Sequence, residues 1–473
     1  MAKSSTMKNS RLLILVAILI LASTVTVFAG GSREKIEKEY KIAEELFSQG
    51  KYEAAIKALE NFIKDAEEQR DLFTTWQISK AWIKIGQSYE KLDQWAPAFN
   101  AYQRVSDIYP SNSDAQAGME RNRKKTGQPE VTKIIQLFLN LDTNSMAFSP
   151  EGKRIAYTTY QKKNGEKIRS IKIIDTDSNT LKQFPIKSAK DASWFPSSIS
   201  WSPDGKKIAY TFWRSGAILG EIWVVDSDGT NNRRLVKLDE YASCSGPLNW
   251  ILNSSKIIFD ADTHIYIIGV DGTGRKILKE NITESCKTYL SSDGKKIAFQ
   301  DNYEFEQKSN LWVMDANGQN VKCLTENLKN REHGVFDVSW LSKTNKLIYT
   351  YGYIMGTVTF GGDLWLVNYD GTEKKELVKT YDVTSFASSP DGKRIIYVRY
   401  FMDEERNQFT HMELWIINND GSSDIKLGTL LRGENSRIVN TYWSSDGKTI
   451  ALVTGNGQLI LLDLKSGNDP IAH

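Results

Sequence analysis

The residues best suited to acid–base or metal chemistry are four histidines: His264, His333, His411 and His473. Metal binding or proton transfer would need two or three of them to converge, because a single side chain rarely completes such a site. The sequence has no G-x-S-x-G, H-E-x-x-H, G-x-x-x-x-G-K or C-x-x-C pattern of the kind that marks nucleophilic, zinc, phosphate or redox chemistry. We therefore expect no catalytic residue, no cofactor, no metal and no enzymatic activity.

Residues 1–29 have the features of an export signal. Three cations, Lys3, Lys8 and Arg11, precede an uninterrupted apolar stretch over residues 12–21. A small-residue cleavage site follows at Val27–Ala29. An uncleaved signal anchor is the alternative, since apolar character continues to Phe28. In both cases we expect an exported protein, periplasmic or extracellular, that touches the membrane only through an uncleaved leader.

The charge balance argues against two classes of partner. The chain has 473 residues and a formal net charge of +3, from 61 Lys and Arg against 58 Asp and Glu. The three cations of residues 1–29 account for this excess, because that segment contains no acidic residue. The remainder has no net charge and hence no global field to attract nucleic acid or an anionic membrane surface.

Residues 33–127 have helical spacing, with small residues recurring among large ones. Ala43 and Ala55 in a first set, and Gly86 and Ala98 in a second, would let pairs of helices approach closely. This pattern resembles two tetratricopeptide repeats, with a third helix over residues 114–125 as a cap. The interval between the two sets is longer than usual, which predicts that the second helix of the first repeat extends through residues 69–79.

A different pattern recurs seven times over residues 132–473, with three clear copies, two close variants and two degenerate copies: an apolar run, then S-P-D-G-K, then I-A-Y. A further apolar run and another turn follow each copy, and five of these turns are Asp-Gly or Asn-Gly, the strongest short-range hairpin signal. Seven units of four antiparallel strands, with a mean period of about 49 residues, predict a seven-bladed β-propeller. The expected fold class is α + β multidomain, a short helical array followed by an all-β propeller.

The ends of the repeat region predict how the ring closes. The last unit stops after its third strand, whereas an unpaired strand, Thr132–Asn140, precedes the first unit. This strand should complete the last blade, because closure removes exposed sheet edges. Eight tryptophans fill two repeated strand positions and are expected to pack between blades: Trp201, Trp250, Trp340 and Trp443, then Trp223, Trp312, Trp365 and Trp415.

The S-P-D-G-K-x-I-A-Y units resemble the WD40-like repeats of the TolB propeller, the periplasmic component of the Tol system. The resemblance covers all seven units, but TolB has six blades behind an α/β domain, whereas this sequence predicts seven behind helical repeats. It implies an exported, non-enzymatic scaffold for protein–protein interaction, with a role in assembly or transport in the cell envelope. The helical module would be either a concave surface for a peptide or protein, or a short spacer.

The alternative function is a propeller that binds or cleaves polysaccharide. Some pectin-degrading lyases resemble seven-bladed propellers and hold a metal near the axis with histidine ligands. In this sequence His333 precedes a first strand and His411 a third, which would place both on one face of the propeller.

Long connections between the second and third strands of each unit predict a recognition face, because they emerge on the same side of the ring. They combine aromatic residues with charged ones, a composition typical of contact surfaces on a rigid scaffold. We expect a protein or peptide of the cell envelope to bind here, through Phe212, Trp213, Arg214, Tyr303, Phe305, Tyr351, Tyr353, Phe360, Tyr400 and Phe401. The sequence does not specify an oligomeric state.

Cys244 and Cys286 lie in the connections that precede the first strands of two consecutive units. These connections are neighbours around the ring, so the two thiols would be able to form a disulfide in an oxidising compartment. The alternative is two free thiols, because sequence does not fix the distance between them.

Overall fold

The structure is a computed structural model, and it describes most of the chain beyond the leader. The described residues are 37–67, 72–138, 141–163, 166–176, 181–185, 194–214, 219–238, 246–283, 286–303, 308–325, 333–355, 358–359, 361–403, 408–430 and 438–465. The chain divides into two compact units, Met1–Gln128 and Pro129–His473. None of the helices within the described ranges is both long and apolar enough to cross a membrane.

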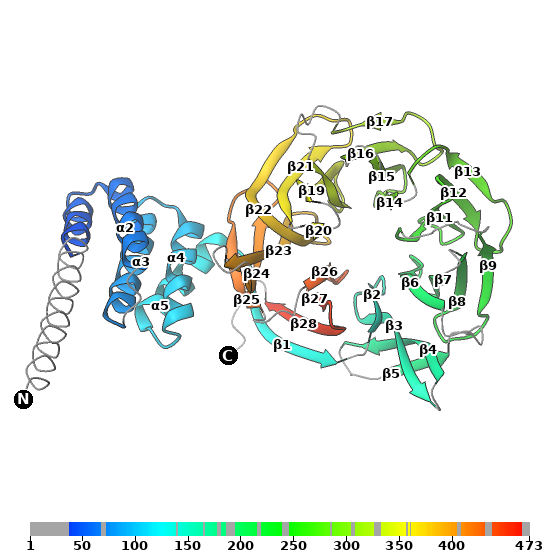
Figure 1. The fold of residues 1–473 in the computed structure, drawn as a ribbon, viewed down its shortest axis with the longest axis horizontal. Helices are drawn as coiled ribbons and strands as arrows, with labels where there is room; N and C mark the ends of the chain where they lie inside the picture. The colour runs from blue at the N-terminus through cyan, green and yellow to red at the C-terminus, as the bar shows by residue number, and fades with distance from the viewer. Residues whose placement is uncertain are drawn as a thin grey trace, which may run out of the picture. The chain divides into compact units, whose positions relative to one another are not determined.

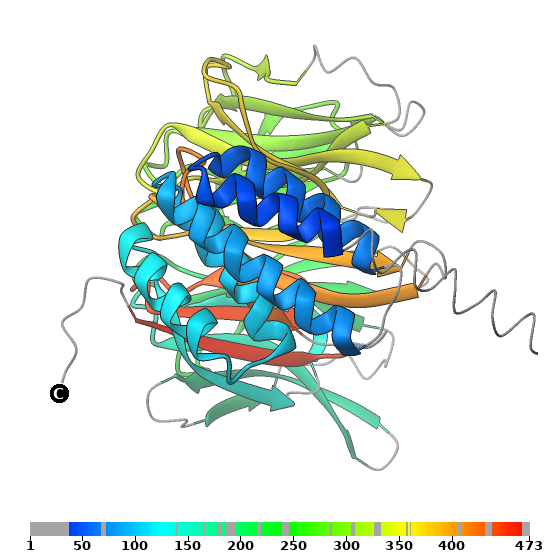
Figure 2. The same ribbon diagram turned by 90° about the vertical axis from the view of Figure 1, so that its left-hand side faces the viewer.

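The first unit is an array of helices in which each helix packs on the next along the chain (Figures 1 and 2). A helical segment over 37–48 is followed by α2 (Tyr52–Glu67), α3 (Leu72–Lys91), α4 (Trp95–Ile108) and α5 (Ser113–Thr126). Asn112 caps α5, because its side chain accepts a hydrogen bond from the Ala115 backbone N–H at 2.9 Å. Gly127 ends α5 in the left-handed conformation that favours glycine.

Small residues permit the close helix packing that the sequence predicts. The Tyr102 ring of α4 lies against Gly86 of α3 and Gly118 of α5. A Cβ atom would lie 2.8 Å from the ring at Gly86 and 2.5 Å from it at Gly118, too close for any side chain. The glycines therefore create the space that holds Tyr102 in the core.

The predicted extension of the first repeat's second helix is wrong. Residues 72–79 belong to α3, the first helix of the second repeat, which has 20 residues. Neither Gly nor Pro interrupts α3 before Gly86, and Ile78, Ala81 and Ile85 keep one face of it in the core. Because this apolar face is continuous along α3, the additional residues between the two repeats lengthen α3 rather than α2.

The second unit is a ring of antiparallel β-sheets, consistent with the predicted propeller (Figure 1). Blades 1 to 4 are four-stranded: blade 1 is β2 (Leu141–Phe148), β3 (Arg154–Lys163), β4 (Glu166–Asp175) and β5 (Leu181–Pro185); blade 2 is β6 (Trp194–Trp201), β7 (Lys207–Arg214), β8 (Leu219–Asp226) and β9 (Arg233–Lys237); blade 3 is β10 (Asn249–Trp250), β11 (Lys256–Ala261), β12 (His264–Gly269) and β13 (Lys276–Lys279); and blade 4 is β14 (Lys287–Leu290), β15 (Lys296–Tyr303), β16 (Lys308–Asp315) and β17 (Lys322–Cys323).

Two further sheets complete the ring. The joined sheet has eight strands: β18 (His333–Trp340), β19 (Lys346–Met355), β20 (Val358–Thr359), β21 (Gly362–Asn368), β22 (Lys375–Ser388), β23 (Arg394–Asp403), β24 (Gln408–Asn418) and β25 (Ile425–Leu430). The closing blade consists of β26 (Ile438–Trp443), β27 (Thr449–Thr454), β28 (Gln458–Lys465) and β1 (Glu130–Phe138).

The prediction of seven separate blades is corrected by these sheets. The described structure has five four-stranded blades, and the fifth and sixth sequence repeats form the joined sheet. The strand β22 connects them, because Val378 pairs with β21 while Phe386 pairs with Tyr397 of β23. Residues 375–388 contain no Gly or Pro to turn the chain, so the backbone stays extended where a loop was expected.

The ring closes as the sequence predicts. The strand β1 pairs with β28 and supplies the fourth strand of the closing blade, with Ile135 opposite Leu461. Residues from the two ends of the propeller region therefore share one sheet. This pairing covers an edge of β28 that would otherwise be open to other chains.

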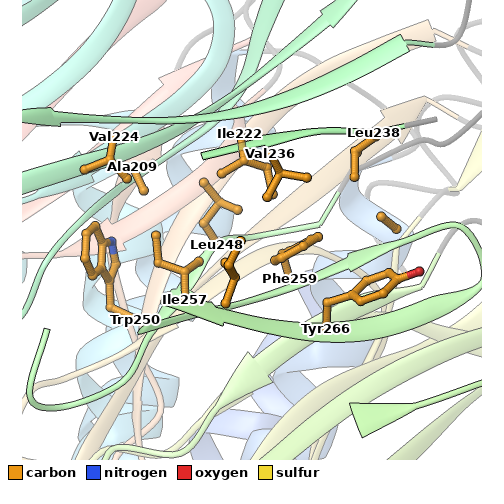
Figure 3. Packing of buried hydrophobic residues seen from close by; sticks show 12 residues of the cluster. Ala209, Ile222, Val224, Val236, Leu238, Leu248, Trp250, Ile257, Phe259 and Tyr266 are labelled. Atoms are coloured by element: carbon orange, nitrogen blue, oxygen red, sulfur yellow. The ribbon is translucent and has the colours of Figure 1, made fainter. Parts of the chain in front are cut away.

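Apolar side chains fill the space between neighbouring blades, as Figure 3 shows for blades 2 and 3. The indole N–H groups of the first tryptophan set link blades further: Trp201 donates to Ala147 O at 3.1 Å, Trp250 to Ser200 O at 3.3 Å and Trp340 to Tyr289 O at 2.8 Å. Trp443 occupies the same position, but its buried Nε1 has no hydrogen-bond partner within the described structure. The prediction of packing between blades is thus correct for three of this set.

The second tryptophan set stacks within its own blades. Trp223 lies on Tyr210 with ring centroids 6.4 Å apart, and Trp312 lies on Phe299 at 6.2 Å. Trp365 and Trp415 stack in the same way on Tyr349 and Tyr397. The four tryptophans also pack in or against the apolar clusters between neighbouring repeats, so the predicted packing is correct for this set, and stacking on the adjacent strand of the same sheet adds to it.

Candidate functional site: the axial cavity and the long-loop face

The first strands of the repeats surround a cavity of about 500 Å³, which we call the axial cavity. Strands β6, β14 and β26 lie near the centre of the ring (Figure 1). The lining comes from six successive repeats: Ser198, Gly246, Pro247, Lys287, Tyr289, Asp337, Val338, Ser339, Ser385, Phe386, Ala387, Ser388, Asn440, Thr441, Tyr442 and Trp443. A volume of this size is in the range of small-molecule sites.

Breaks in strand register direct polar groups toward this cavity. The pairing shifts between Pro196 and Ile199 in β6 and between Val335 and Val338 in β18. Such a bulge removes residues from the ladder and reorients their side chains. At these two bulges the cavity-lining residues are Ser198 and Asp337.

Second strands supply the hydrogen bonds that the bulges remove from the ladder. The backbone N–H of Ser198 donates to Thr211 Oγ1 at 2.9 Å, and that of Asp337 donates to Thr350 Oγ1 at 3.2 Å. In blade 3 the equivalent residue is Asp260, whose carboxylate accepts from the backbone N–H of Gly246 at 3.3 Å. The sequence analysis did not predict that a second-strand side chain would bond the first strand. The signal for it is a polar residue directly after the aromatic residue of the second strand.

Two acids and one lysine influence the electrostatics of the cavity: Asp337 and Lys287 line it, and the buried Asp260 bonds the lining residue Gly246. Burial raises the pKa of Asp260 to about 7 and also raises that of Asp337. The positive charge of Lys287 acts in the opposite direction on both acids. Within the described structure Lys287 makes no side-chain hydrogen bond or ion pair, so its ammonium group is available to the cavity.

Two tyrosines in the wall stay protonated at physiological pH. Burial raises the pKa of Tyr442 to about 12 and that of Tyr289 well above its ordinary value, with the charge of Asp337 adding to both shifts. Both phenols are therefore neutral groups able to donate a hydrogen bond.

A second cavity of about 180 Å³ shares Lys287, Asp337 and Asn440 with the axial cavity. It also includes Val383 and Thr384, which lie in β22 on the side of the bulge away from the tight S-P-D-G turn. The shared residues therefore lie toward the long-loop face, meaning the side of the propeller where second and third strands connect.

Part of the predicted recognition set lies in the interior of the blades. Phe212 is 3% exposed and belongs to an apolar cluster between blades 1 and 2, so it is not available to a partner. Tyr351 is half-buried against the cluster between blade 4 and the joined sheet.

The rest of the predicted set lies at strand ends or outside the description. Tyr400 and Phe401 are half-buried in β23, and the Phe401 ring stacks on His411 with centroids 4.7 Å apart. For Trp213, Arg214, Tyr303 and Tyr353 the structure describes only the backbone, in β7, β15 and β19. Phe305 and Phe360 lie outside the described residues.

A charged cluster lies beside Phe401, between β23, β24 and β25. Arg399 lies over the Phe401 ring and bonds Asp382 through two of its nitrogens, each 3.0 Å from an oxygen. Burial alone would raise the pKa of Glu413, but bonds from His411 and Lys426 lower it to about 2. These pairs hold the side chains in place before any partner arrives, which reduces the entropic cost of binding.

The comparison with known families identifies the second unit. Residues 140–384, just over half of the chain, match the family described as the TolB beta propeller domain. The chain belongs to this TolB-type propeller family. The expectation from the S-P-D-G-K repeats is therefore confirmed. Residues 80–112, which cover most of α3 and all of α4, match the tetratricopeptide repeat.

The solved structures that are similar to this chain have low sequence identity to it. An oligogalacturonate lyase from Vibrio parahaemolyticus is 12% identical, with a TM-score of 0.50, over 70% of this chain and 91% of that chain. A chain of the Mitotic Checkpoint Complex is 18% identical, with a TM-score of 0.49, over 72% and 95% of the two chains. At such identity the lyase shares the propeller fold alone. No curated protein matches the chain.

The histidines of this TolB-type propeller are dispersed. His264 lies in blade 3 and contacts the Asp262 carbonyl, while His411 lies in the joined sheet and contacts Glu413 at 3.5 Å. His333 begins β18, and His473 lies outside the described residues. Within the described ranges no three His, Cys, Asp or Glu side chains gather as a metal site would require.

The cysteine pair is only partly described. Cys286 is a buried, free cysteine, and burial raises the pKa of its thiol far above the usual value. Cys244 lies outside the described residues, so its predicted pairing with Cys286 stays a prediction. A thiol so strongly protonated is a poor nucleophile for disulfide exchange.

Proposed function

We propose that this protein is an exported, non-enzymatic scaffold that binds a protein partner in the cell envelope and serves assembly or transport there. One observation carries the proposal: a tetratricopeptide repeat and a TolB-type propeller occur in one chain. Both kinds of domain generally mediate protein interactions. The leader-like residues 1–29 support export.

The long-loop face is the proposed contact surface of the propeller. Its described part contains Tyr400 and Phe401 next to the Arg399–Asp382 pair. A rigid sheet that holds aromatic and arginine side chains at its edge matches the usual composition of interaction hot spots. The opposite face carries the tight S-P-D-G turns, where Lys206, Lys295 and Lys393 are exposed.

The test is quantitative capture from an envelope extract with the immobilised mature chain. Replacing Trp213, Tyr303 and Tyr400 together by Ala should lower capture of the main partner at least about tenfold, since hot-spot truncations cost more than 1 kcal/mol each. The matched control replaces Lys206, Lys295 and Lys393 by Ala on the other face and should leave capture unchanged. Equal capture by both triple variants, with unchanged melting temperatures, would refute the assigned surface.

Export has a separate test. Intact mass spectrometry of the protein from the envelope fraction should show a chain that begins near Gly30. A chain with Met1 in the membrane fraction would support the anchored alternative, whereas a chain with Met1 in the cytoplasm would contradict export.

The second candidate is a propeller that binds or cleaves polysaccharide, and the fold likeness to oligogalacturonate lyase is what favours it. Metal analysis of the purified chain and incubation with oligogalacturonate decide this point. A stoichiometric transition metal together with unsaturated product would support the lyase. Metal-free protein that leaves the substrate intact would exclude it.

A further inference from the structure

The axial cavity contains a cation and an anion that do not neutralise each other. Lys287 enters from β14 and Asp337 from β18, and both line the axial cavity and the smaller cavity beside it. The charge of Lys287 acts to lower the pKa of Asp337, but within the described residues no ion pair joins the two side chains. In the part of the chain that the structure describes, the Asp337 carboxylate accepts one hydrogen bond, from the backbone N–H of Val338 at 3.0 Å. Both residues are half-buried, and partly desolvated charges are costly when unpaired, so a complementary ligand would stabilise both.

Two neutral groups beside the cavity also lack partners. Thr441 is 7% exposed and lines the cavity, yet its hydroxyl has no hydrogen-bond partner within the described structure. The Trp443 indole N–H is likewise unpartnered, although Trp201, Trp250 and Trp340 each use the equivalent group to bond a neighbouring blade. Buried polar groups are nearly always satisfied, so a cluster of exceptions around one cavity needs an explanation.

We propose that the axial cavity binds a small organic acid that carries a carboxylate and, a few bonds away, a hydrogen-bond donor. Lys287 binds the carboxylate, and Asp337 accepts from the donor, which is an ammonium or a hydroxyl group. Thr441 and Trp443 of β26 supply further donors to the acid's oxygens. Tyr289 and Tyr442 form the uncharged wall.

The inference goes beyond the scaffold function and does not depend on it. The long-loop face recognises a protein in the proposed function, whereas the cavity is lined by residues in and beside the first strands and has the volume of a small-molecule site. Loss of capture in the face variant would leave the cavity intact, so the two proposals fail independently.

Isothermal titration of the mature chain with two matched pairs of probes tests the proposal. Glycylglycine is compared with glycylglycinamide, and gluconate with sorbitol. In each pair only the first compound carries a carboxylate. At least one acid should bind about tenfold more tightly than its neutral counterpart, as expected for one charge-assisted hydrogen bond. Binding of glycylglycine alone identifies an ammonium as the donor, and binding of gluconate alone identifies a hydroxyl.

Variants locate the binding. Lys287→Met should weaken the acid about tenfold, whereas Lys276→Met, at an exposed position in β13, should leave its affinity unchanged. Thr441→Val keeps the side-chain shape, so it should weaken binding without lowering the melting temperature, and it decides the question if Lys287→Met does not fold. The proposal is overturned if neither acid binds, if the neutral probes bind equally well, or if the Lys287→Met and Thr441→Val variants that fold retain full affinity.

Discussion

Asp260 illustrates how one residue combines a structural role with an electrostatic cost. Its carboxylate accepts from the Gly246 N–H and from the Thr288 hydroxyl, at 3.3 and 3.5 Å, and so holds blades 3 and 4 together. In blade 2 and the joined sheet a neutral threonine accepts the equivalent backbone N–H, from the adjacent strand of its own sheet. Burial is the dominant influence on Asp260, and it favours the protonated form.

Stability should therefore fall as pH rises through this group. The folded pKa of about 7 exceeds the ordinary value of 3.8, so the stabilising contribution is complete below the ordinary value and is lost as pH rises to about 7. The shift corresponds to about 4 kcal/mol at most. Asp260→Asn should be more stable than the wild type at pH 8 and similar to it at pH 4, as measured by urea unfolding.

The control for this experiment is Asp271→Asn in an exposed turn, where bonds from Thr273 lower the pKa. That variant should not gain stability at high pH. If Asp260→Asn is less stable than the wild type at both pH values, the ionised carboxylate stabilises the fold and the assigned cost is wrong.

At the scale of elements, the close approach of α3, α4 and α5 depends on missing side chains. An added Cβ at Gly118 would lie 2.5 Å from the Tyr102 ring. Glycine to alanine in a helix ordinarily stabilises by roughly 0.5–1 kcal/mol. Gly118→Ala should instead destabilise the helical unit by about 1–3 kcal/mol through overpacking, measured by thermal unfolding.

A second substitution separates steric strain from helix propensity. Combining Gly118→Ala with Tyr102→Leu should cost less than the sum of the two single changes, because both act on one contact. Strict additivity, or a more stable Gly118→Ala variant, would show that the helices have room to move apart.

Local signals account for most of the strands that the sequence predicted correctly. Each S-P-D-G or Asp-Gly turn fixes two strands at once, as with Gly205 in its left-handed turn, so the hairpins followed from spacing. The continuous strand β22 could not be predicted in this way. The lack of a turn residue in 375–388 is a weak signal, and the strong repeat pattern predicts two separate strands there. The half-buried state of Phe401 and the burial of Phe212 depend on packing that no single repeat reveals.

The axial cavity was not predictable for a different reason. Lys287 and Asp337 come from different repeats and meet only because the ring brings first strands together. Their unsatisfied charges, and the unpartnered Thr441 hydroxyl, are properties of that assembly rather than of any motif. The bulges beside Asp337 and Thr441 also interrupt the regular alternation on which strand prediction relies.

At the scale of the whole propeller, β1 provides the closure. A chain that begins at residue 140 lacks β1 and exposes the edge of β28, whereas one that begins at residue 129 keeps it. The shorter chain should unfold at a lower temperature and aggregate more at equal concentration, as seen by light scattering during thermal unfolding. Identical behaviour of the two chains would mean that the ring closes without this pairing.

The central claim is that the long-loop face holds a protein partner in the cell envelope. Photo-crosslinking in living cells tests it most directly, with a photoreactive amino acid placed at Tyr400 or, as a control, at Lys393 on the tight-turn face. The account predicts a discrete crosslinked protein from position 400 and none from position 393. No crosslink from position 400, or the same product from both positions, would contradict it.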